Sequence, residues 1–103
     1  MMRGVRAPSV GDVNNYMVER YLPGITADQL DEASGRLAAA AKELAAHGVA
    51  VRYVSSTFIP EEESCFCSFE SADVDSVRRT CEQAGVPFAR IVETHFSPHR
   101  EEQ

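Results

Sequence analysis

The sequence lacks any apolar run near the roughly 20 residues that a membrane span requires. It is also poor in basic residues: 10 lysines and arginines stand against 16 aspartates and glutamates, for a formal net charge of -6. A nucleic-acid or anionic-membrane surface needs a basic patch, so neither is expected as a partner. The start, MMRGVRAPSVGDVNN, has no apolar segment typical of a secretory signal. We therefore expect a cytoplasmic protein.

Several catalytic signatures are absent as well. The chain has no G-x-G-x-x-G, no Walker lysine loop, no G-x-S-x-G and no H-E-x-x-H. It has only 3 cysteines, and in the cytoplasm an odd, small number of this kind indicates free thiols and not a disulfide framework.

Two of these cysteines lie close together in the segment EEESCFCSFES, residues 61–71. On a strand, Cys65, Cys67 and Phe69 share one face, and Phe66 and Ser68 share the other with Glu70. Parallel side chains about 6.6 to 6.8 Å apart at Cα disfavour a disulfide. A structural zinc site needs more cysteine pairs. The pattern favours thiols that pack as small hydrophobes.

The order of elements predicts the fold. With 103 residues, the chain is expected to form one domain over 15–97, between a flexible arm (1–14) and a polar tail (98–103). Strand patterns at 16–22, 49–59, 64–70 and 89–96 alternate with two helical patterns, one starting at Thr26 and one ending at Gly85. This β-α-β-β-α-β order predicts an α+β, ferredoxin-like antiparallel sheet with both helices on one face.

The other face of that sheet is predicted to be uncovered. The strands carry apolar residues on both faces, so we expect a second subunit to cover it, giving a homodimer through the sheet face.

Polar residues in two neighbouring strands form a candidate site. Glu19 lies in the first strand, and Glu93 and His95 share a face of the last strand. If they converge on the uncovered face, carboxylates and an imidazole suit nickel, zinc or copper. The same groups could supply a general base. The alternative is structural: Glu19 pairs with Arg20, Arg52 or Arg90, and His95 is simply exposed near the chain end.

The segments YMVERYLPGITADQL, VRYVSSTF and CFCSFESADVDSVRRTCEQAGVPFARI resemble a family of small actinobacterial and proteobacterial proteins catalogued as a domain of unknown function. One structurally described member binds nickel. The resemblance covers about residues 16–96 and implies a ferredoxin-like domain that dimerises into an α+β barrel, with Ni²⁺ as ligand. The family pattern falls on Glu19, Ser56 and Cys67 and does not include Cys65.

Three functional hypotheses follow, the last of which is a purely structural or protein-interaction module that binds neither metal nor small molecule. The first is a non-enzymatic protein that binds divalent nickel, with zinc or copper as substitutes, for buffering or sensing; its candidate ligands are Glu19, Glu93, His95 and Cys67. The second is a cofactor-free enzyme of the dimeric α+β barrel type, a monooxygenase or isomerase, or a module that binds a small ligand between sheet and helices. Tyr53, Phe58, Phe66 and Phe69 are the candidates to line such a cleft.

Overall fold

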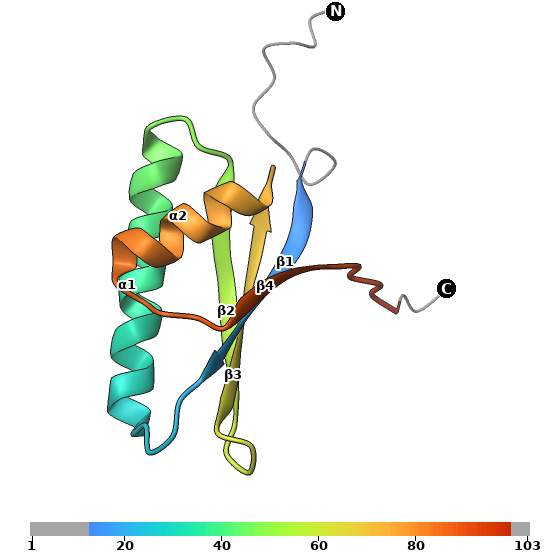
Figure 1. Cartoon of the computed structure of the whole chain (residues 1–103). Helices are drawn as coiled ribbons and strands as arrows, with labels where there is room; N and C mark the ends of the chain where they lie inside the picture. Colours follow the sequence, from blue (N-terminus) through green and yellow to red (C-terminus); the bar gives the residue numbers. More distant parts are fainter. Residues whose placement is uncertain (1–12, 100–103) are drawn as a thin grey trace, which may run out of the picture.

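The computed structural model describes residues 13–99, which form a four-stranded sheet and two helices (Figure 1). The elements in chain order are β1 (Asn14–Tyr21), α1 (Ala27–Ala46), β2 (Val51–Ile59), β3 (Ser64–Ser71), α2 (Val74–Ala84) and β4 (Arg90–Thr94). This confirms the α+β, ferredoxin-like fold.

The sheet has the strand order β2-β3-β1-β4, and all three pairings are antiparallel. The first and third strands are central, as predicted. Both helices lie on one side of the sheet (Figure 1). A register shift between Tyr53 and Ser55 leaves Val54 without a partner in β3, which is a β-bulge in the edge strand β2.

Helix α1 starts and ends at the predicted signals. Thr26 accepts a hydrogen bond from the Gln29 amide at 3.1 Å, and the Gln29 side chain accepts one from the Thr26 amide at 3.0 Å, forming a capping box. At the other end, Gly48 has φ +91°, in the region that favours glycine, and the chain turns there into β2.

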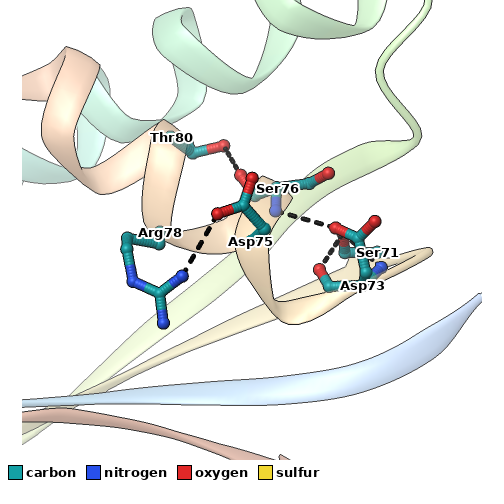
Figure 2. Close-up of polar contacts among 6 residues, drawn as sticks. All are labelled: Ser71, Asp73, Asp75, Ser76, Arg78 and Thr80. Atoms are coloured by element: carbon teal, nitrogen blue, oxygen red, sulfur yellow. Dashed lines mark hydrogen bonds and ion pairs between the residues drawn. The ribbon is translucent and has the colours of Figure 1, made fainter.

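Helix α2 begins at a turn built by Ser71 and Asp73 (Figure 2). The Asp73 carboxylate accepts a hydrogen bond from the Ser76 amide at 2.9 Å. The Ser71 hydroxyl donates to the Asp73 carbonyl at 2.8 Å, which fixes the exit from β3. One turn into the helix, the Thr80 hydroxyl donates to the Ser76 carbonyl.

The core lies between the helices and one face of the sheet. Alternate residues of β1 and β3 are buried there, namely Tyr16, Val18 and Arg20 of β1 and Cys65, Cys67, Phe69 and Ser71 of β3. The alternation predicted for β3 is therefore confirmed. Leu37, Ala41 and Leu44 of α1 and Val77 and Cys81 of α2 supply the opposing layer.

The strands β1, β2 and β4 have other bounds than the sequence predicted. β1 starts at Asn14, inside the predicted arm; the rest of that arm, up to residue 12, lies outside the described residues. β2 starts at Val51 and not at residue 49. β4 ends at Thr94 and not at residue 96, so the sheet does not hold His95. The tail from residue 100 also lies outside the described part.

Between residues 13 and 99, no helix has the length and apolar character of a membrane span.

Candidate functional site

The sheet face that the helices leave bare carries a mixture of apolar and charged side chains. The β1–β4 register pairs Met17 with Val92 and Glu19 with Arg90, and the β1–β3 register pairs Glu19 with Phe66. Met17, Val92 and Phe66 are all only partly buried. We call this surface the open face; it is lined by Asn15, Met17, Glu19, Phe66, Ser68, Glu70, Arg90, Val92 and Thr94.

A hollow of about 330 Å³ lies on the open face, where the chain leaves β4. Asn15, Met17, Ser68 and Glu70 contribute to its lining, together with His95 and Phe96. The segment after β4 runs away from the helices (Figure 1). Phe96 on this segment is 69% exposed.

Both glutamates of the open face are paired with arginines. Arg90 bonds to the Glu19 carboxylate through its Nε, and Arg52 bonds to Glu70 in the same way at 3.0 Å. The ion pair between Glu19 and Arg90 is one of the structural alternatives that the sequence offered.

The predicted convergence of Glu19, Glu93 and His95 on one face is wrong for the single chain. Glu93 pairs with Tyr16 in the β1–β4 register, so its side chain leaves the sheet on the side of the helices, opposite to that of Glu19. Glu19 also lies opposite Arg90, at the start of β4, whereas Thr94 at the end of β4 lies opposite Asn15. Glu19 and Asn15 are four residues apart, so Glu19 lies about 13 Å along the strand from the end of β4.

The structure does bring Glu93 and His95 together. Both line a wide, open hollow of about 520 Å³ around the end of β4, with Val13, Asn14 and Asn15 of the neighbouring chain segment. Both side chains are exposed, and within residues 13–99 neither takes part in an ion pair. They are thus the predicted ligands best placed to accept an ion from solvent.

Cys67 lies on the other side of the sheet, fully buried against the helices. Ser56 donates a hydrogen bond to its Sγ at 3.1 Å, and the Tyr53 hydroxyl lies 2.6 Å from the Ser56 hydroxyl. Burial, with a further contribution from Cys67, raises the pKa of Cys65 to about 11. Burial likewise raises the pKa of Cys81 to about 12. The thiols Cys65 and Cys81 therefore stay protonated at neutral pH.

Three of the four aromatic residues suggested for a cleft between sheet and helices, namely Tyr53, Phe58 and Phe69, belong to the core instead. Phe69 is 1% exposed and its ring lies 5.4 Å from that of Tyr53, and Phe58 packs against the same cluster. Phe66 is on the open face.

Among residues 13–99, no three His, Cys, Asp or Glu side chains are grouped so that they could hold a metal ion. One copy of the described chain therefore presents at most an incomplete set of ligands.

Residues 16–94 match the model of a protein family described as "Nickel responsive protein SCO4226-like". The chain belongs to this family. The match confirms the resemblance drawn from the sequence, and the family description itself supplies the link to nickel. No curated protein sequence matches this chain significantly.

A solved structure supports the same relationship. The crystal structure of SCO4226 from Streptomyces coelicolor A3(2) superposes with a TM-score of 0.70 at 26% sequence identity, over 82% of this chain and 99% of that one. The family match over residues 16–94 therefore covers nearly all of the residues that the structure describes, 13–99.

Of the residues that line the open-face hollow, sequence reasoning named only His95 as a site residue, and it did not connect His95 with the polar residues Asn15 and Glu70. Strand alternation already placed Glu70 opposite the buried face. What it could not supply was the register, which pairs Asn15 with both Glu70 and Thr94 across the three strands.

Proposed function

We propose that this protein binds a divalent metal ion, nickel first, as a homodimer, and that it buffers or senses nickel in the cytoplasm without catalysing a reaction. The match of residues 16–94 to a nickel-responsive family carries the proposal. The unpaired acidic and imidazole groups at the end of β4 support it, because imidazole and carboxylate ligands suit a borderline divalent ion.

His95 and Glu93 are the proposed ligands from each chain. They line the same hollow, they are exposed, and no arginine or lysine in the described part neutralises Glu93. By contrast, Glu19 and Glu70 are engaged by Arg90 and Arg52. The divalent ions Zn²⁺ and Cu²⁺ are expected to compete for the same groups.

The dimer part of the proposal addresses the shortage of ligands in one chain. In a dimer with a two-fold axis through the open face, the open face of one copy would lie against the open face of the other. His95 also lines the open-face hollow, so two copies would bring two imidazoles to the interface. Glu93 leaves β4 on the helix side, so its carboxylate would reach the ion only around the end of the strand, and water would complete the coordination. The partly exposed apolar residues Met17, Phe66 and Val92 would be covered in the same step.

Nickel titration of the metal-stripped protein by calorimetry tests the proposal. We expect saturable binding that His95→Ala abolishes and Glu93→Gln weakens. His47→Ala is the matched control: His47 is an exposed histidine at the end of α1, where its ring bonds to the Glu43 carbonyl, and its removal should leave the binding unchanged.

Each contrary result has a separate meaning. Binding that survives both ligand variants would refute these ligands and direct attention to Glu19 or Cys67. Absence of saturable binding at micromolar nickel would contradict the metal function itself.

A second function fits the open-face hollow. Its volume of about 330 Å³ falls at the lower end of the range for small-molecule sites, about 300 to 1,000 Å³. Met17, Val54 and Phe96 give it apolar walls, and Ser68 and Glu70 give it polar groups. A small organic ligand is the candidate that remains if nickel does not bind.

A further inference from the structure

Buried thiols gather around a buried arginine on the helix side of the sheet. Cys65, Cys67 and Cys81 have no exposed surface, and Arg20 is only 5% exposed. Arg20 and Cys65 are direct partners in the β1–β3 pairing, so their side chains leave the same face side by side.

The first observation is the separation of the two β3 sulfurs. The Cys65 and Cys67 Sγ atoms lie 4.0 Å apart, so the side chains converge, although alternate residues on a strand start out parallel. With metal–thiolate bonds of about 2.3 Å, two sulfurs on one ion are about 4.0 Å apart at a bond angle of about 120° and about 4.6 Å apart when collinear. The pair therefore needs at most a small outward shift to hold one ion.

The second observation is an unbalanced charge. The Arg20 guanidinium donates from Nε to the Pro87 carbonyl at 3.0 Å, and within residues 13–99 it pairs with no carboxylate. A buried cation without an anion is costly. Arg20 is the strand partner of Cys65, so its positive charge lies beside the thiol pair and favours negative charge on the sulfurs.

A third observation concerns orientation. The Ser56 hydroxyl donates a hydrogen bond to Cys67 Sγ, and the Tyr53 hydroxyl is hydrogen-bonded to that of Ser56. Hydrogen bonds of this kind outside the ligand set fix the direction of a ligand and tune it.

We propose that Cys65 and Cys67 form a two-thiolate site for a soft monovalent ion, Cu(I), with Arg20 as the counter-charge. Binding replaces the two S–H protons, which pass to solvent, by two S–Cu bonds. The resulting centre carries one negative charge, which balances that of the guanidinium. Soft thiolates select Cu(I), whereas zinc prefers four ligands. The site is separate from the Glu93–His95 hollow and does not depend on the nickel proposal.

Anaerobic titration of the reduced protein with Cu(I), against bicinchoninate as a competing chelator, tests this site. We expect one ion per chain, with slow uptake because both thiols are buried. Cys65→Ala and Cys67→Ala should each abolish competition with the chelator. Ser56→Ala should weaken binding by about 10-fold, the lower range for loss of a partner outside the ligand set.

Cys81→Ala and His47→Ala are the controls, and both should retain wild-type affinity for Cu(I). Cys81 is an equally buried thiol on α2, so its variant separates ligation by the β3 pair from a general effect of removing a core thiol. Loss of binding in Cys81→Ala, its survival in Cys65→Ala, or its absence in the wild type would overturn the proposal.

X-ray absorption at the copper edge identifies the atoms bound to copper in the wild type, so it tests the site even if a cysteine variant does not fold. Two sulfur neighbours and no nitrogen or oxygen neighbour are expected. Nitrogen or oxygen neighbours would place the ion elsewhere and refute the site.

Discussion

Phe66 and Phe69 lie three residues apart on β3 and face opposite layers of the molecule. Phe69 is 1% exposed in the core, whereas Phe66 lies partly exposed on the open face. Removing a buried phenylalanine side chain costs about 3 to 5 kcal/mol. We expect a loss of that size for Phe69→Ala in the free energy of unfolding, measured with urea.

Phe66→Ala is the matched comparison, because it deletes the same atoms from the same strand. In dilute protein, where single chains dominate, it should cost clearly less than Phe69→Ala. Equal losses for the two variants would contradict the assignment of faces.

The sequence predicted which residues share a strand face but not how neighbouring strands are aligned. Alternation correctly separated Cys65, Cys67 and Phe69 from Phe66. It misplaced Glu93 relative to Glu19, because alternation within one strand does not say which of its faces matches which face of the neighbour. The β1–β4 register decides this, and it arises from packing of the whole sheet.

Helix α2 starts at a hydrogen-bonded turn in which Asp73 is the N-cap (Figure 2). The bond from the Ser76 amide to the carboxylate lowers the pKa of Asp73. Loss of such an N-cap costs about 1 kcal/mol. We expect Asp73→Ala to lower the free energy of unfolding by about this amount at neutral pH, measured with guanidinium chloride.

The same cap gives a pH dependence. Because the pKa of Asp73 is lower in the folded chain than in the unfolded one, its contribution is complete above the unfolded pKa, about 3.9, and is lost as the pH falls through the folded pKa. The difference between wild type and Asp73→Ala should therefore shrink in acid. Asp75→Ala is the control, since its ion pair with Arg78 is exposed and contributes little. A difference that does not change with pH would contradict the charged cap.

Element ends were predictable where a side chain or glycine marks them, and not where a partner strand sets them. Thr26, Gln29 and Gly85 are local signals, and the helices begin and end there. β4 has a strand-like pattern up to residue 96, but β1 begins at Asn14, and the last β1–β4 pair joins Asn15 to Thr94. Asn14 still pairs with Ser71 of β3, so β4 separates from β1 one residue short of the start of β1, and His95 lies beyond the last β1–β4 pair.

For the whole molecule, the sequence predicted the fold and the uncovered face but could not complete a metal site. The β-α-β-β-α-β order leaves only a few right-handed arrangements, so topology follows from element order. Ligand geometry requires side chains from distant segments to meet, and within residues 13–99 the described chain brings together Glu93 and His95 without a third ligand. Under the proposed nickel function, a second copy of the chain is the proposed source of the remaining ligands.

The proposed dimer through the open face predicts the size of the particle in solution. A homodimer has twice the mass of the 11.3 kDa chain, which sedimentation equilibrium measures directly. Val92 lies beside Met17 in the middle of this face, so Val92→Glu would bury a carboxylate without a partner in the interface. Breaking an interface in this way costs several kcal/mol, because a buried unpaired charge is strongly unfavourable.

We therefore expect wild type to sediment as a dimer and Val92→Glu as a monomer that keeps its secondary structure. Ala39→Glu, which adds the same charge at an exposed position of α1, should remain dimeric. A monomeric wild type at tens of micromolar would contradict the dimer, and a dimeric Val92→Glu would move the interface away from the open face. If the dimer also supplies the second pair of ligands, Val92→Glu must lose nickel binding although His95 and Glu93 are intact, which ties the assembly to the site.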